Sequence, residues 1–166
     1  MSIPPEQIIN NWRIERKNKI TSLIEYKNHK DQCWMSNNKK DVKDQKKMIP
    51  NDVYGNILVL GLGLGIIIEM LAKYEKVKYI AVIEQAPEVI EMVWKYIEHN
   101  NKAEIIQMKD INYIKSNSNK YNYVFADTHI DCSDKTKKRI VEPLKQLTKE
   151  YYPSAQFIPW KTKTKK

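Results

Sequence analysis

Apolar positions from residue 57 onward follow two different periods along the chain. The four apolar residues at 57–60 stand close to glycines on both sides, which is typical of a strand buried on both faces of a parallel sheet. Similar short apolar segments predict four more strands, at residues 79–83, 104–108, 121–126 and 155–160. Segments whose apolar residues recur every three or four positions predict helices at residues 66–74, 87–97, 111–115 and 135–151.

Strands that alternate with helices predict an α/β fold with a mostly parallel sheet and flanking helices. Crossovers between parallel strands are right-handed, and ligands bind at the carboxyl ends of the strands. Only 39 residues follow Asp127, so we expect a sheet that is shortened at the C-terminus. Such a sheet has an uncovered edge strand that a second copy of the chain could pair with, which is consistent with a homo-oligomer.

The first fifty residues have a different pattern. A stripe of apolar residues predicts one amphipathic helix over residues 9–23. Residues 27–47 are strongly polar, and we expect a loop with a short helix that is docked by Trp34 and Met35. These two residues either cover a ligand as a lid or only anchor the loop. The expected organisation is a helical and loop extension at residues 1–52, an α/β domain at 53–160 and a basic tail at 161–166.

Composition places the chain among globular proteins of one ordinary domain. It has 166 residues, of which 42% are hydrophobic. The strongest apolar run, residues 57–71, contains three glycines and Glu69, so no membrane span is expected. The first six residues lack the basic start and the apolar stretch of a secretory signal, and we therefore expect a cytoplasmic protein.

The net charge of +9 sits largely in residues 13–47 and in the tail. Clustered lysines attract phosphate backbones, which leaves contact with nucleic acid open, although a charge run is more often a solvated surface. Cys33 and Cys132 are too few for a disulfide framework or a zinc site, so both are expected to be free thiols.

All four glycines of the chain are Gly55, Gly61, Gly63 and Gly65. The last three lie between a predicted strand and a predicted helix, where a missing Cβ lets the backbone turn tightly and approach a ligand. A dinucleotide site requires a glycine at position 66, which is Ile66 here, and a P-loop requires a lysine and a hydroxyl after its glycines. The spacing therefore disfavours both of these sites.

Acidic residues stand at the ends of two predicted strands. Glu84 closes the second strand about twenty residues after the glycine turn, where a carboxylate can accept hydrogen bonds from both ribose hydroxyls. Asp127 closes the fourth strand and could hold a ligand ammonium or accept a proton. His129 could serve as a base near neutral pH, although an exposed loop histidine is favoured, and no metal site is expected from Asp127, His129 and Asp131.

Four successive motifs give the chain a family resemblance, at residues 58–65, 82–84, 108–110 and 124–127. They resemble the motifs of Rossmann-like S-adenosylmethionine-dependent methyltransferases, including the spermidine-synthase-like branch. The Trp34-Met35-Ser36 segment is similar to a feature of small methyltransferase-like proteins from bacteriophages, which would place the chain in a host cytoplasm. The resemblance implies a Rossmann-like fold with S-adenosylmethionine as cofactor.

The resemblance also implies roles for particular residues. Glu84 would contact the ribose, Asp110 and Ile111 would border the adenine, and Asp127 would lie where the methionine and substrate ends meet. The usual acidic residue before the first glycines is replaced by Val59 or Leu60, which leaves open what would hold the methionine ammonium. The expected catalytic residues are Asp127 and His129, and the expected cofactor-binding residues are Gly61, Gly63, Gly65, Glu84, Gln85, Asp110, Ile111 and Asp127.

The function expected from these features is that of an S-adenosylmethionine-binding methyltransferase-like enzyme with an unknown acceptor. Three alternatives stay open: an aminopropyltransferase, an S-adenosylmethionine-cleaving enzyme and a binding module without catalysis. The N-P-P-Y type of segment found in DNA enzymes that methylate amino groups is absent, so methylation of a base by that type of enzyme is not supported.

Overall fold

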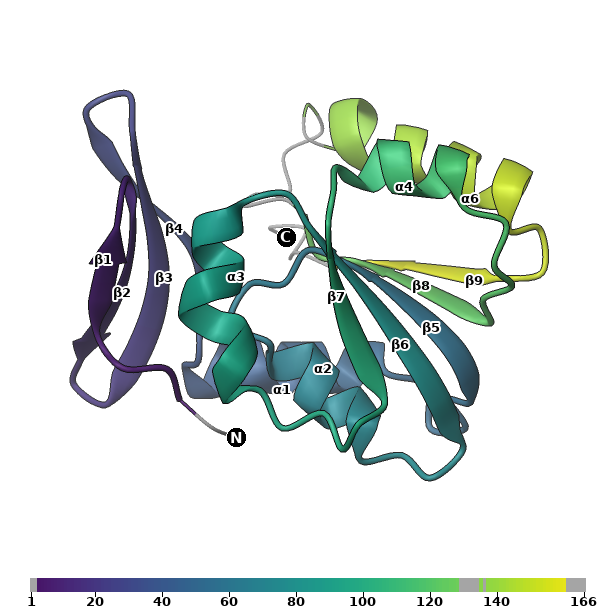
Figure 1. Ribbon diagram of the computed structural model, residues 1–166, viewed down its shortest axis with the longest axis horizontal. Coiled ribbons are helices and arrows are strands. Elements are labelled where there is room, and N and C mark those ends of the chain that lie inside the picture. The colour runs from purple at the N-terminus through teal and green to yellow at the C-terminus, as the bar shows by residue number, and fades with distance from the viewer. Residues whose placement is uncertain (1–2, 129–134, 136, 161–166) are drawn as a thin grey trace, which may run out of the picture.

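Two sheets and their helices make up the computed structural model, which describes residues 3–128, 135 and 137–160. One sheet has five strands in the order β7-β6-β5-β8-β9, and the other has four strands in the order β1-β2-β3-β4. Figure 1 shows the smaller sheet beside the carboxyl ends of the larger one, with helices on both faces of the larger sheet. The predicted α/β fold with a parallel sheet and flanking helices is confirmed.

The larger sheet is parallel at every strand pair. Its strands are β5 (Gly55–Leu60), β6 (Val77–Glu84), β7 (Ala103–Gln107), β8 (Tyr123–Ala126) and β9 (Gln156–Pro159). Strand β5 pairs with β6 on one side and with β8 on the other, so the order of connection reverses there. A crevice opens at such a reversal, outside the carboxyl ends of the strands.

Helices cover the two faces of this sheet because side chains along β5 alternate between them. Ile57 and Val59 join the core beneath one group of helices, and Leu58 and Leu60 join the core beneath the other. The first group is α1 (Lys39–Met48), α2 (Ile66–Ala72) and α3 (Pro87–Val93), which continues as the 3₁₀ turn η1 (Trp94–Tyr96). The second group is α4 (Asp110–Ser116) and α6 (Glu142–Tyr151), which follows the π-helical turn η2 (Lys137–Val141).

The smaller sheet is an antiparallel meander. Its strands are β1 (Gln7–Ile9), β2 (Trp12–Lys17), β3 (Ile20–Lys27) and β4 (Lys30–Ser36). It docks on α3, where the Gln7 side chain donates to the Met92 carbonyl (2.9 Å) and the Asn10 side chain donates to Glu88 (2.8 Å). Buried Ile14 and Leu23 join the same core as α3.

The predicted helix over residues 9–23 is therefore wrong, and part of the predicted loop at residues 27–47 is strand β4. Two-residue turns at Asn18-Lys19 and Asn28-His29 have positive φ at both positions and join the strands as hairpins. Asparagine tolerates this conformation, but the second positions hold a lysine and a histidine where glycine would be the usual signal. Without a glycine at the turns, the apolar spacing of residues 9–23 predicts a helix where the structure has a hairpin.

The five strands and four helices predicted after residue 56 are confirmed, with shifts of boundary. The helix predicted over 87–97 is α-helical only to Val93, and the one predicted over 135–151 contains a π-helical turn before Glu142. The division at residues 52 and 53 stays a prediction, and the tail at 161–166 lies outside the described residues. No helix in the described ranges has the length and apolar character needed to cross a membrane.

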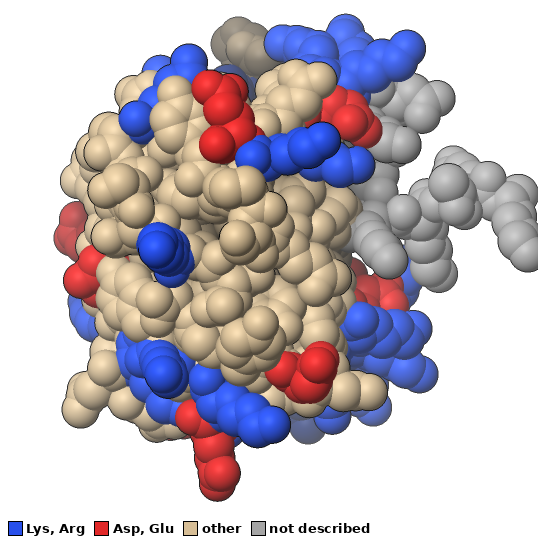
Figure 2. Space-filling model, turned by 90° about the vertical axis from the view of Figure 1, so that its right-hand side faces the viewer, with Lys and Arg blue, Asp and Glu red and all other residues tan. Residues whose placement is uncertain are grey.

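Charged side chains on one face of the molecule are dispersed. Figure 2 shows the face at the right of Figure 1, where lysine, arginine, aspartate and glutamate are interspersed over a largely uncharged surface. Contact with nucleic acid through the basic residues stays a prediction.

Leu23 and Ile20 distinguish the strand from the predicted helix. In β3, Leu23 is 2% exposed and Ile20 is 39% exposed, whereas a helix would place both on its apolar stripe. Leu23→Ala is expected to lower the free energy of unfolding by about 2–5 kcal/mol, and the matched variant Ile20→Ala by less than about 1 kcal/mol. Urea unfolding of both variants measures the difference, and equal losses would contradict the strand assignment.

Candidate functional site

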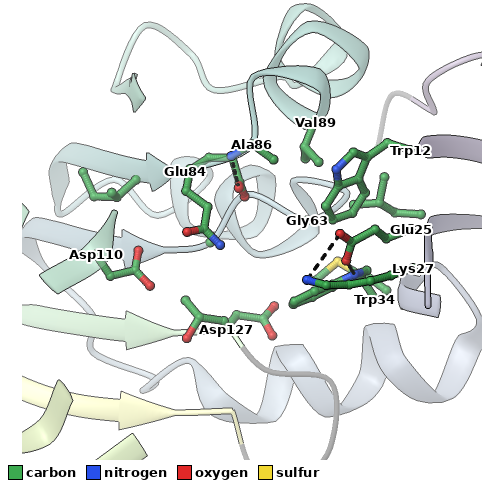
Figure 3. Close-up of a pocket in the computed structure, with 16 residues that line it drawn as sticks. Trp12, Glu25, Lys27, Trp34, Gly63, Glu84, Ala86, Val89, Asp110 and Asp127 are labelled. Carbon is green, nitrogen blue, oxygen red and sulfur yellow. Dashed lines mark hydrogen bonds and ion pairs between the residues drawn. The ribbon is translucent and has the colours of Figure 1, made fainter. Parts of the chain in front are cut away.

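A cleft lies at the carboxyl ends of β5, β6 and β8, and the smaller sheet forms its other wall (Figure 3). The space between its walls is about 770 Å³ when the open mouth is included. Both sheets contribute polar and apolar side chains to the lining. The cleft occupies the position where the reversal of strand order leaves a crevice.

The floor of the cleft is the turn after β5. Gly61 and Gly63 have φ of 93° and 53° and both line the cleft. A Cβ on Gly61 would lie 2.5 Å from the Asp127 carbonyl oxygen, and one on Gly63 would lie 2.6 Å from the Met35 methyl carbon. Glycine is thus required at Gly61, where the obstacle is backbone, and is favoured at Gly63, where the φ is positive but the end of the Met35 side chain can move.

Gly65 has a different role from the other two glycines. It is the N-cap of α2 with φ of 73°, and a Cβ there would collide with the Ile97 side chain. It faces the core and does not line the cleft. Of the three predicted glycines, Gly61 and Gly63 therefore lie at the site and Gly65 packs in the core.

Glu84 ends β6 and is held in place by the backbone on both sides of it. Its Oε2 accepts a hydrogen bond from the Leu62 N–H (3.0 Å), and its Oε1 accepts one from the Ala86 N–H (2.9 Å). Each carboxylate oxygen keeps a further lone pair that a ligand hydroxyl can use. Gln85 lines the cleft beside it.

Two aspartates give the cleft titratable groups near neutral pH. Burial, reinforced by the charge of Glu84, raises the pKa of Asp110 to about 7. Burial, reinforced by Asp41, raises the pKa of Asp127 to about 7 as well. Both pKa values rise because a charge is costly where water is scarce, so a cationic ligand would draw the proton off either group. Ile111 is 43% exposed and does not line the cleft.

Side chains of the smaller sheet complete the cleft. Glu25 of β3 is 7% exposed, accepts from Trp34 Nε1 (3.0 Å) and Asn11 Nδ2 (3.3 Å), and lies 3.8 Å from Lys27 Nζ. Trp12 and Trp34 are neighbours, with ring centroids 5.8 Å apart. The wall formed by the smaller sheet consists of Trp12, Leu23, Glu25, Lys27, Trp34 and Met35.

Most of these wall residues were missed because a helix was expected where β2 and β3 form. The signal that would have found them is the alternation of Leu23, Glu25 and Lys27, which places all three on one side of a strand. The asparagines at the turns would have supported it.

Met35 ties the smaller sheet to the glycine turn. Its sulfur accepts from the Leu64 N–H at 3.2 Å and from Gln45 Nε2 at 3.6 Å. Trp34, the residue before it in β4, lines the cleft and donates to Glu25. Both residues thus anchor a strand, and the same contacts place them over the cleft.

Other predicted features fall outside the cleft or outside the described residues. His129, Asp131 and Cys132 lie in the segment that the structure does not describe, and Cys33 is a free thiol. Val59 and Leu60 are fully buried, so neither faces a ligand. Among the described residues there is no group of three His, Cys, Asp or Glu side chains suited to a metal ion.

Comparison with protein families gives one match, to the spermine/spermidine synthase domain over residues 46–152. No curated protein sequence shows significant similarity to the chain.

Solved structures with the same fold include spermidine synthases. The one from Thermotoga maritima has 15% identity and a TM-score of 0.60, and the matched region covers 91% of this chain and 54% of the synthase chain. A spermidine synthase in complex with the transition state analogue AdoDATO has 15% identity and a TM-score of 0.61, with coverage of 91% and 55%. The chain thus spans about half the length of these proteins.

Human methyltransferase-like protein 13 in complex with SAH is a further structure with this fold. It has 17% identity and a TM-score of 0.52, and the matched region covers 71% of this chain and 61% of the human chain. At such identities these similarities show the fold.

Asp127→Asn tests the buried carboxyl in the cleft. The pKa of Asp127 in the folded protein (about 7) lies above its ordinary value of 3.8, so ionisation weakens the fold and the wild type loses stability as the pH rises from about 4 to 7. Asparagine does not ionise, and between pH 5 and pH 8 the variant is expected to gain about 2–3 kcal/mol relative to the wild type. Urea unfolding at both pH values measures this gain, and parallel behaviour would show that Asp127 ionises freely.

Proposed function

The chain belongs to the spermine/spermidine synthase domain family, and from this premise we propose that it is a transferase that binds S-adenosylmethionine or a close derivative, of the methyltransferase-like type. The observation that carries the proposal is the position of Glu84. Its carboxylate is fixed against the glycine turn at the carboxyl end of β6, with lone pairs left for the two hydroxyls of a ribose.

The remaining lining of the cleft fits the same class of ligand. Asp110 stands at the start of α4, close enough to Glu84 for the charge of Glu84 to raise its pKa. An adenine amino group could donate to the Asp110 carboxyl there. Thr128 Oγ1 is buried and has no hydrogen-bond partner in the described part of the chain, so a polar ligand group would satisfy it. The complexes of related folds with SAH and with AdoDATO support this assignment.

The bound ligand would supply an activated carbon attached to its sulfonium sulfur. When a nucleophile attacks this carbon, the carbon–sulfur bond breaks and its electron pair goes to the sulfur. The protein then has to orient the acceptor, exclude water and take up a proton. Asp127, whose pKa of about 7 keeps it poised between its two forms, is the group that we propose either receives that proton or holds the ammonium of the ligand. His129 stays a predicted base outside the described residues.

Aminopropyl transfer is a second candidate that two observations favour. The spermidine synthase structures cover 91% of this chain, whereas the methyltransferase-like structure covers 71%. The cleft is also rich in carboxyl groups, which suit an amine acceptor: Glu25, Glu84, Asp110 and Asp127. Both candidate reactions use the same nucleotide end of the cleft, and they differ in the group that leaves sulfur.

Glu84→Ala is the test of the binding site. Wild-type protein is expected to bind S-adenosylmethionine in a calorimeter, and loss of hydrogen bonds to a charged acceptor should weaken binding by about 10- to 100-fold. Glu91→Ala is the matched control, since it removes an exposed carboxylate from α3 outside the cleft and should leave the affinity unchanged. Equal affinities of the wild type and Glu84→Ala would refute the proposed site.

Product analysis identifies the reaction. The protein is incubated with S-adenosylmethionine or its decarboxylated form, with and without a mixture of amines, and the products are measured by mass spectrometry. S-adenosylhomocysteine with a methylated acceptor supports methyl transfer, and methylthioadenosine with a lengthened amine supports aminopropyl transfer. Ligand breakdown without any acceptor identifies cleavage, and unchanged ligand under every condition would contradict a transferase.

A further inference from the structure

Lys27 is the one cationic side chain among the described residues that line the cleft. It ends β3 on the wall opposite the glycine turn, and Figure 3 shows its side chain extending over the cavity toward the side where Asp127 also points. Its side chain is 60% exposed, so it is accessible to a ligand. A cation in an otherwise acidic cleft can bind an anionic group of a ligand.

Glu25 does not require Lys27 as a permanent partner. Its carboxylate already accepts hydrogen bonds from Trp34 Nε1 and Asn11 Nδ2, whereas Lys27 Nζ lies 3.8 Å away. Within the described residues, Lys27 Nζ donates no hydrogen bond at all. Because the lysine end of this pair is exposed to water and the two atoms lie 3.8 Å apart, Lys27 can take another anion at little cost.

The charges divide the cleft into two ends. Glu84 and Asp110 form an acidic end at β6 and α4, and Glu25, Lys27 and Asp127 form a mixed end at β3 and β8 (Figure 3). The acidic end matches sugar hydroxyls and a base, which donate hydrogen bonds. The mixed end matches a group that carries a positive and a negative charge together, as an amino-acid tail does.

We propose that Lys27 pairs with the α-carboxylate of the donor while Asp127 pairs with its ammonium, so that the cleft selects S-adenosylmethionine over the decarboxylated form. This inference rests on the proposed function and narrows it, because aminopropyl transfer requires the decarboxylated donor and would be disfavoured. A decarboxylated donor leaves Lys27 without that partner and gains nothing from it.

Calorimetry with S-adenosylmethionine and with decarboxylated S-adenosylmethionine tests the role of Lys27. The wild type should bind the first about tenfold more tightly, as expected for one charge-assisted hydrogen bond. Lys27→Met should remove this preference by weakening only the first ligand, and Lys27→Arg should keep it. Lys30→Met, which removes an exposed lysine of β4 outside the cleft, is the control for the loss of one charge.

The outcomes separate this inference from the proposed function. Equal binding of the two ligands by the wild type, a preference for the decarboxylated form, or equal weakening of both ligands in Lys27→Met would overturn the role of Lys27 while the nucleotide site stands. Failure of the wild type to bind either ligand would overturn both.

Discussion

The turn after β5 depends on Gly61, which has no side chain to keep the neighbouring backbone away. Gly61 leaves room for the carbonyl of Asp127, and Gly63 leaves room for Met35. The first contact brings the end of β8 against the end of β5, and the second brings β4 of the smaller sheet over both. The walls of the cleft therefore meet at a backbone turn, and a Cβ on Gly61 would push β5 and β8 apart.

Hydrogen bonds then lock the turn in one arrangement. The N–H of Leu62 donates to Glu84, and the N–H of Leu64 donates to the sulfur of Met35. Backbone N–H groups of a buried turn need partners, and here the partners are a strand end of one sheet and a strand of the other. Glu84 is consequently oriented before any ligand arrives, which lowers the cost of ordering the site on binding.

Enclosure by the smaller sheet also sets the electrostatics of the cleft. Asp110 and Asp127 have raised pKa values chiefly because burial disfavours their ionised forms. Glu25 is buried as well, but it has two hydrogen-bond donors and a nearby lysine. The distribution of opposite charges in the cleft is thus the feature that separates the candidate donors, since methyl and aminopropyl transfer share the nucleotide end and require different charges at the other.

The order of strands and helices after residue 56, the glycine turn and the acids at the strand ends were determined by the sequence alone. These signals are local: they lie in short apolar runs such as Ile57 to Leu60 and in the spacing of Gly61 from Glu84. Local signals can be recognised in the sequence without knowledge of the fold. Only the tertiary structure decided that Trp12, Glu25 and Lys27 join the site, because they reach it through a sheet whose turns lack glycine and whose docking surface lies on α3, far away in the chain. It also separated Gly65 and Ile111 from the cleft, since which side of a turn or helix faces a cavity depends on neighbours that are distant in sequence.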